Sequence, residues 1–230
     1  MKGILSNSPK TVATVTTNGD LAQLNDIESV VDFDILEFRF DNLFADKSAA
    51  TDLVKTLKTP ILGTVRCPEE GGAHSLTPAM RIELYEEILP LLELVDTEIT
   101  SLSLPEFANF ASEVQGRRIP LIASFHDFEA FPGTAVVAKK MNEAFELGAD
   151  VAKVAVHLET MKDLFSLVEL VESHRSDGRL VSAMGMGPLG KISRLILAKA
   201  GSCLNYGYLQ QPNAPGQWSA RELRGLISEF

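Results

Sequence analysis

The sequence predicts a closed barrel of eight parallel strands, each followed by a helix. Short apolar segments alternate with amphipathic segments along the whole chain, and its 230 residues are enough for one such barrel. An open, doubly wound sheet is the competing architecture. The first strand is not followed by a GxGxxG or Walker loop, which counts against that alternative. No low-complexity linker and no internal repeat divides the chain, so we expect a single domain over residues 1–230.

Eight segments have the length and the apolar, β-branched content of buried strands. Parallel strands need crossover connections, which the intervening amphipathic segments can supply. The expected strands are Thr11–Thr16, Asp34–Phe40, Ile61–Arg66, Val95–Thr100, Ile119–Phe125, Asp150–Val156, Leu180–Met184 and Cys203–Tyr206.

The helix that follows the third strand has the clearest start. Thr77 is a good N-cap, Pro78 suits the first helical position, and Leu84 and Ile88 lie on one face. The other expected helices are Leu21–Val30, Lys47–Leu57, Leu104–Gln115, Ala135–Leu147, Met161–Val171, Leu189–Ala198 and Ser219–Ile227.

The charge balance excludes some partners. The chain has 21 basic and 31 acidic residues, a net charge of −10, which disfavours nonspecific binding to nucleic acid or to an anionic membrane. No apolar run is long enough for a signal peptide or a membrane-spanning helix. The two cysteines, Cys67 and Cys203, form no disulfide framework. We therefore expect a cytoplasmic protein that binds neither nucleic acid nor membrane.

Polar residues interrupt strands that should be apolar on both faces. Glu37 and Arg39 alternate with Leu36 and Phe38, so their side chains are expected inside the barrel. Other strands carry polar residues in the same way, mostly toward their carboxyl ends, where barrel active sites lie. These residues are Thr64, Arg66, Asp96, Glu98, Ser124, His126 and Lys153.

Each of these residues also has a structural interpretation. Lys153 could reach the surface or pair with a carboxylate, and His126 could be a hydrogen-bonded structural histidine. Glu37 and Arg39 could form one buried ion pair, and the two acidic residues of the fourth strand are best interpreted as structural counter-charges. Burying so many charges together is costly unless they are paired, however, and their number favours a functional site.

Other chemistries have weaker support. No HExxH or GxSxG motif is present, and the nearby cations would repel a metal ion. Cys67 could act as a thiol nucleophile, but only its position beside Arg66 suggests this. The segment Gly185–Gly187 could cradle a phosphate, or its glycines could serve a tight turn.

Six segments, in order along nearly the whole chain, resemble the type I 3-dehydroquinate dehydratase family. The match is specific because the segments share one order and fall on the expected barrel strands. They are EFRFD at 37–41, TVRCPEEGG at 64–72, SFHDF at 124–128, DVAKVAV at 150–156, MGMGPLGKISR at 184–194 and APGQ at 214–217.

The resemblance implies a lyase of the shikimate pathway that converts 3-dehydroquinate to 3-dehydroshikimate through a lysine Schiff base. Lys153 matches the lysine that forms the imine, His126 the general acid and base, and Glu70 the carboxylate that orients this histidine. The family needs neither a metal nor an external cofactor, and its usual homodimer is expected here.

The resemblance also implies the residues that bind the substrate. Glu37, Arg39 and Arg66 match groups that hold its ring hydroxyls, and Arg194 and Gln217 match groups that hold its carboxylate.

One position departs from the family pattern. Asn213 stands where the family often has a small hydroxyl residue, and a contact from Thr14 is too loosely matched to assign.

Two other functions are kept open: an imine-forming aldolase that acts on a phosphorylated sugar, and a catalytically silent barrel that only binds. The lysine, histidine and glutamate assigned above argue against the silent barrel, because a binding protein needs no nucleophile.

Overall fold

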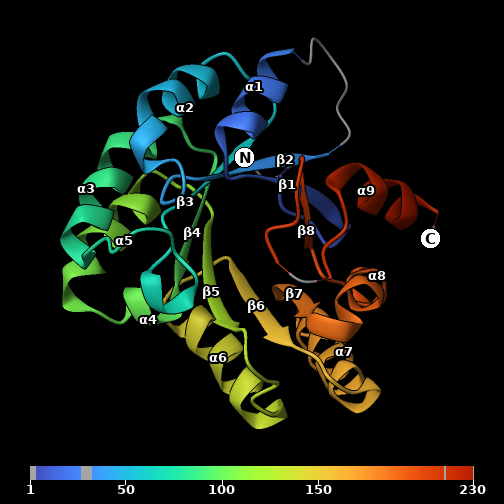
Figure 1. Cartoon of the computed structure of the whole chain (residues 1–230). Helices are drawn as coiled ribbons and strands as arrows, with labels where there is room; N and C mark the ends of the chain where they lie inside the picture. The colour runs from blue at the N-terminus through green and yellow to red at the C-terminus, as the bar shows by residue number, and fades with distance from the viewer. Residues whose placement is uncertain (1–3, 27–32, 215, 230) are drawn as a thin grey trace.

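The computed structural model describes residues 4–26, 33–214 and 216–229. Eight parallel strands form one sheet that curls into a nearly closed barrel, and helices pack around it (Figure 1). The predicted architecture is therefore confirmed. In spatial order the strands are β7 (Leu180–Met186), β6 (Val151–His157), β5 (Leu121–Asp127), β4 (Leu94–Glu98), β3 (Ile61–Thr64), β2 (Ile35–Arg39), β1 (Lys10–Val15) and β8 (Leu204–Tyr208).

The α-helices follow the expected alternation. They are α1 (Asn18–Asp26), α2 (Lys47–Val54), α3 (Pro78–Ile88), α4 (Ile99–Leu102), α5 (Ala108–Gly116), α6 (Thr134–Glu146), α7 (Met161–Ser176), α8 (Gly190–Ala200) and α9 (Ala220–Ser228). The predicted N-cap of α3 is confirmed, because the Thr77 side chain accepts a hydrogen bond from the Met80 amide at 3.3 Å.

Some predicted boundaries were wrong. The fourth strand ends at Glu98, and the next residue begins α4. The segment expected as a helix from Leu104 instead begins with a 3₁₀ turn at Pro105–Phe107. The expected end of the first helix, after Asp26, lies outside the described residues.

The inner face of the barrel is layered. At the amino ends of the strands it is filled by apolar side chains such as Val12, Ile35, Leu62, Ile122 and Val151. Two residues further along the strands, the inward side chains become polar, and this polar layer continues to the carboxyl ends. The apolar layer closes the bottom of the barrel, and the polar layer faces the end where an active site is expected.

The outer face packs under the helices. Leu36, Phe38 and Phe40, predicted to face outward, are buried in the large apolar cluster between strands and helices. Their alternation with Glu37 and Arg39 therefore separates the core from the inner polar layer, as the sequence pattern predicts.

The barrel is held together differently where β7 meets β8. Within the described part of the chain these two strands share no ladder, and isolated contacts join them. The Cys203 amide donates to the Val181 carbonyl at 2.8 Å, and the Ser182 hydroxyl donates to the Leu204 carbonyl at 2.7 Å. A backbone amide and a serine hydroxyl thus pair with carbonyls that a regular ladder would have satisfied.

Candidate active site

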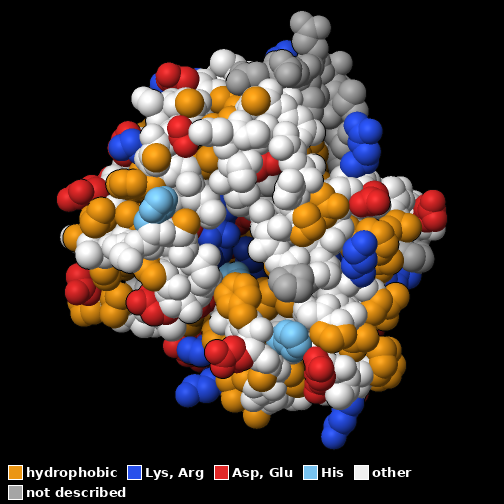
Figure 2. All heavy atoms as spheres, in the orientation of Figure 1, with side chains coloured by type: hydrophobic (Ala, Val, Ile, Leu, Met, Phe, Trp, Pro, Cys, Tyr) orange, Lys and Arg blue, Asp and Glu red, His pale blue; other side chains and the backbone are white. Residues whose placement is uncertain are grey.

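A cavity of about 330 Å³ opens at the carboxyl ends of the strands. Figure 2 shows a hollow on this face with basic side chains inside it. The structure brings all eight predicted site residues together, because each of them lines this one cavity. They are Glu37, Arg39, Arg66, Glu70, His126, Lys153, Arg194 and Gln217.

Lys153 lies near the bottom of the cavity on β6 and is buried. Its Nζ is 2.6 Å from Oδ2 of Asp96 and 3.8 Å from Oε1 of Glu37. The same atom sits 4.0 Å from the ring centroid of Tyr206, in cation–π geometry. Of the two structural interpretations, the side chain does not reach the surface, but it does pair with a carboxylate. It also lines the cavity and is therefore accessible to a molecule there.

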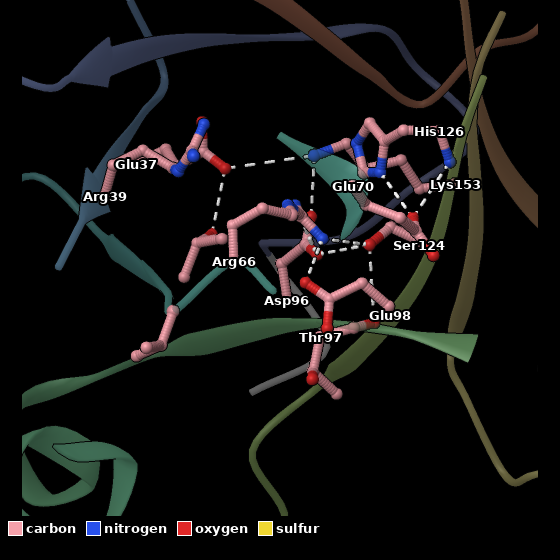
Figure 3. Close-up of polar contacts among 12 residues, drawn as sticks. Glu37, Arg39, Arg66, Glu70, Asp96, Thr97, Glu98, Ser124, His126 and Lys153 are labelled. Carbon is pink, nitrogen blue, oxygen red and sulfur yellow. Dashed lines mark hydrogen bonds and ion pairs between the residues drawn. The ribbon is translucent and has the colours of Figure 1, made fainter. Parts of the chain in front are cut away.

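Arg66 connects Lys153 to a buried acidic network (Figure 3). Its guanidinium donates to Asp96 at 2.9 Å, to Glu98 at 2.9 Å and to the Ser124 hydroxyl at 2.6 Å. Burial opposes the ionisation of Asp96, but the charges of Arg66 and Lys153 outweigh it and lower the pKa of this carboxyl. Asp96 and Glu98 are therefore counter-charges, in agreement with the interpretation favoured from the sequence. Asp96 also directly contacts Lys153, the candidate nucleophile.

His126 and Glu70 form a second unit on the wall of the cavity. Oε2 of Glu70 accepts from the backbone amide of His126 at 3.0 Å and lies 2.9 Å from its Nδ1 (Figure 3). While Glu70 is ionised its carboxylate can only accept, so Nδ1 then carries the proton and Nε2 keeps its lone pair. This tautomer makes Nε2 a proton acceptor.

The ionisation of this pair is set by burial. Burial raises the pKa of Glu70 to about 7, against the opposing charge of Arg66. Burial also holds the pKa of His126 well below 6.5, helped by the positive charges of Arg66 and Lys153. A proton taken up by the pair near pH 7 therefore resides on Glu70, and His126 stays neutral at physiological pH.

The two residues predicted as a possible ion pair, Glu37 and Arg39, do not pair with each other. Arg39 instead forms a two-point contact with Asp41, at 2.9 and 2.8 Å. Glu37 accepts from Thr14 at 3.0 Å and from Thr64 at 2.9 Å. Both side chains are held on the cavity wall, where they offer an acceptor and a donor to hydroxyl groups.

Arg194 is a buried cation without a counter-charge. Among the described residues no carboxylate lies within ion-pair distance of it, and its only hydrogen bond runs from Nη1 to the Tyr206 carbonyl at 2.9 Å. Its Nε has no partner within the described structure. Burial lowers its pKa to about 10, so it remains charged at neutral pH. The arrangement suits an anion brought in by a ligand.

Gln217 lines the same cavity as Arg194. Its Oε1 accepts from the Asn213 amide at 2.8 Å, which leaves the side-chain NH₂ as a donor. Asn213 itself contacts Thr16 through its side chain at 3.0 Å and also lines the cavity. The loop after β8 therefore contributes amide groups to the cavity that the unpaired cation also lines.

Other predicted alternatives lose support. Burial raises the pKa of the Cys67 thiol to about 12, so it is a poor nucleophile. Gly187 has φ +74°, and a Cβ there would meet the His157 ring at 2.3 Å. A Cβ at Gly185 would meet Leu158 at 2.4 Å, so close packing explains both glycines without a phosphate.

The sequence reasoning missed Tyr206 as a site residue. It packs against the candidate nucleophile from β8, and its hydroxyl has no hydrogen-bond partner among the described residues. No local pattern distinguishes it, since a tyrosine in an apolar strand is ordinarily core. The sequence pattern predicts that Asp96 faces the inside of the barrel, but only its contact with Lys153 shows that it belongs to the site.

Comparisons with known proteins give one consistent result. The sequence model of the type I 3-dehydroquinase family matches residues 11–229. A 3-dehydroquinate dehydratase from Hydrogenobaculum sp. is 33% identical over 201 residues, covering 86% of this chain and 88% of its own. A catabolic 3-dehydroquinate dehydratase from Acinetobacter baylyi is 31% identical over 227 residues, covering 94% and 83%.

Solved structures are similar over nearly the same extent. The 3-dehydroquinate dehydratase of Geobacillus kaustophilus superposes with a TM-score of 0.85 at 27% identity, covering 96% of this chain and 91% of its own. The type I 3-dehydroquinate dehydratase of Clostridium difficile, with covalently modified comenic acid, superposes with a TM-score of 0.83 at 26% identity. The match covers 97% of this chain and 93% of that one. Separately, no helix in the described ranges is both long and apolar enough to span a membrane.

Proposed function

Because this chain belongs to the type I 3-dehydroquinase family of lyases, we propose that it dehydrates 3-dehydroquinate to 3-dehydroshikimate through an imine on Lys153. One observation carries the proposal. A buried lysine and a histidine–carboxylate pair face one small cavity, and an unpaired arginine lies on the wall of the same cavity. These groups are a nucleophile, a base and an anchor for the substrate carboxylate.

The first step forms the covalent link. Lys153 Nζ gives up its ammonium proton and attacks the ketone carbon as a neutral amine. The ketone oxygen takes up that proton and a second one from Nζ, and it leaves as water when the C=N bond forms. Asp96, at 2.6 Å, holds the lysine before the attack and faces the positive iminium after it. The iminium withdraws electrons from the neighbouring carbon more strongly than the ketone does, which makes its proton more acidic.

His126 then moves the proton. Nε2 takes it from the carbon next to the iminium and returns it to the hydroxyl that leaves from the following carbon, so that water departs and a C=C bond forms. A water molecule then hydrolyses the iminium, which releases 3-dehydroshikimate and regenerates the Lys153 amine. Glu70 keeps Nδ1 protonated and the ring in place through its 2.9 Å contact. Such acid–base assistance typically contributes about 10²- to 10⁴-fold to the rate.

The remaining residues position the substrate. Arg194 and Gln217 bind its carboxylate, and Glu37 and Arg39 bind its ring hydroxyls. Arg66 also lines the cavity, but its hydrogen bonds to Asp96, Glu98 and Ser124 occupy most of its donors. We therefore assign it mainly an electrostatic role, with weaker direct contact to the hydroxyls than Arg39. Positioning of this kind supplies a large share of catalysis.

The test is to trap the imine. The protein is incubated with 3-dehydroquinate, treated with borohydride and digested, and the adduct is located by mass spectrometry. We expect a single adduct on the Lys153 peptide, loss of activity in step with labelling, and enone absorbance in the untreated reaction. The Lys153→Ala variant is the matched control. Inactivation with an unmodified Lys153 peptide would overturn the mechanism, and no enone absorbance would overturn the activity.

We also expect a homodimer in the cytoplasm, from the family resemblance. Sedimentation equilibrium of the purified protein tests the dimer. A monomer at micromolar concentration would contradict it without affecting the proposed chemistry.

A further inference from the structure

A second cavity lies on the other side of the histidine–carboxylate pair. Its volume is about 450 Å³, and Glu70 and His126 line both this cavity and the substrate cavity. Its other walls are largely apolar and include Leu76, Leu104 and Phe125. Glu70 and His126 therefore lie between the two cavities, and one side of the Glu70 carboxylate faces the second cavity.

Thr100 supplies the hydrogen bond on that side. Its hydroxyl donates to Oε1 of Glu70 at 3.1 Å, while Oε2 of the same carboxylate serves the amide and Nδ1 of His126. Thr100 lies on α4, the single turn that follows β4, is exposed, and lines the second cavity. Glu70 comes from the loop after β3 and His126 from β5, so Thr100 fixes the carboxylate from the intervening unit of the barrel.

We propose that Thr100 is a positioning residue for the reaction: it holds Oε1 of Glu70 so that Oε2 can orient His126. The inference rests on the proposed function, in which His126 is the base. Without the Thr100 hydroxyl the carboxylate faces apolar walls on this side, and nothing else in the described structure donates to Oε1. The carboxylate could then rotate, and both contacts to His126 would weaken.

The same hydrogen bond favours the charged form of Glu70. The other charged and titratable groups that act on Glu70 are Arg66, Glu98, Cys67 and His126. Arg66 favours the carboxylate and Glu98 opposes it, whereas Thr100 is a neutral donor. Removing that donor should therefore raise the pKa of Glu70 further above about 7 and make the pair take up its proton at higher pH.

The test uses two variants of an exposed residue. Thr100→Val removes the hydroxyl at nearly constant shape, and Thr100→Ser retains it. For Thr100→Val we expect kcat at pH 7 to fall about fivefold, KM to change less than about twofold, and the acidic limb of the kcat profile to move up by about one pH unit. Thr100→Ser should behave like the unmodified protein. In a Glu70→Gln background, Thr100→Val should have no further effect, which shows that it acts through Glu70.

A measurement without substrate separates this inference from the proposed function. The ¹⁵N shifts of the His126 ring in the free protein report its tautomer, and we expect Thr100→Val to reduce the Nδ1–H form at neutral pH while Thr100→Ser preserves it. If the unmodified protein does not dehydrate 3-dehydroquinate, the proposed function fails and the ring spectra still test Thr100. If it does, but Thr100→Val leaves the pH profile and the ring spectra unchanged, Thr100 has no positioning role.

Discussion

Replacing Arg194 by methionine should weaken substrate binding and stabilise the protein. The guanidinium is buried, has one hydrogen bond, and faces no carboxylate in the described residues. Methionine preserves most of the apolar stem and removes the charge. Both effects have one cause: burying a cation without a counter-charge destabilises the unliganded protein, and the counter-charge is the carboxylate of the substrate.

The size of the stability change follows from the environment of Arg194. Burial lowers its pKa from 12.5 to about 10, which corresponds to about 3 kcal/mol against the charged form. Because the folded pKa is depressed and the group is charged in both states at pH 7, the whole penalty applies at that pH. The variant loses one charge-assisted hydrogen bond, about 1.5 kcal/mol. The net gain is about 1.5 kcal/mol, a rise in Tm of about 3 to 6 °C for a chain of this size.

The assay combines thermal unfolding at pH 7 with steady-state kinetics. For Arg194→Met we expect the higher Tm together with a fall in kcat/KM of about 100-fold, mostly through KM, as one charged contact to the substrate is lost. Arg81→Met is the matched control. Arg81 is equally buried but is paired with Glu98, so its loss breaks a buried ion pair, leaves Arg66 as the remaining cation beside that carboxylate in the described structure, and should destabilise the protein by up to about 3 kcal/mol.

Two results would refute this reasoning. If Arg194→Met lowered Tm as Arg81→Met does, the charge of Arg194 would be stabilised by groups of the protein itself and not by a ligand. If KM stayed at the unmodified value, the anion would bind elsewhere in the cavity.

Three further predictions concern the remaining site residues. His126→Ala should cut turnover at least about 100-fold while borohydride still labels Lys153; near-normal turnover would remove it as the base. The folded pKa of Glu70 is raised to about 7, so its favourable contribution to stability is present below its unfolded pKa and is lost as pH rises through about 7. The Tm of Glu70→Gln relative to the unmodified protein should therefore be higher at pH 8 than at pH 5, and a constant difference would argue against the raised pKa. Gln217→Ala should lower kcat/KM by about 10- to 100-fold, with KM raised; unchanged kinetics would leave Arg194 as the main carboxylate contact.

The barrel and the inward set of polar residues can be predicted from the amino-acid sequence alone. Alternation is a local property, so the positions of Glu37 and Arg39 against Leu36 and Phe38 could be assigned without knowing any partner strand. Parallel strands with helical crossovers place all their carboxyl ends at one edge, and this brings distant motifs together in one cavity. The family resemblance added the roles, which composition and spacing could not supply.

Which of these groups are in contact could not be predicted in this way, because it depends on the three-dimensional arrangement of the strands. Asp96 and Lys153 are 57 residues apart and are not on neighbouring strands, yet their side chains meet at 2.6 Å across the barrel. Arg39 pairs with Asp41 and not with Glu37, and Thr100 reaches Glu70 because the fourth strand turns into α4 at Ile99. Such contacts depend on strand register, on the closure of the barrel and on where a strand ends. Those are set by packing of the whole chain, whereas the period of a strand is set by its own residues.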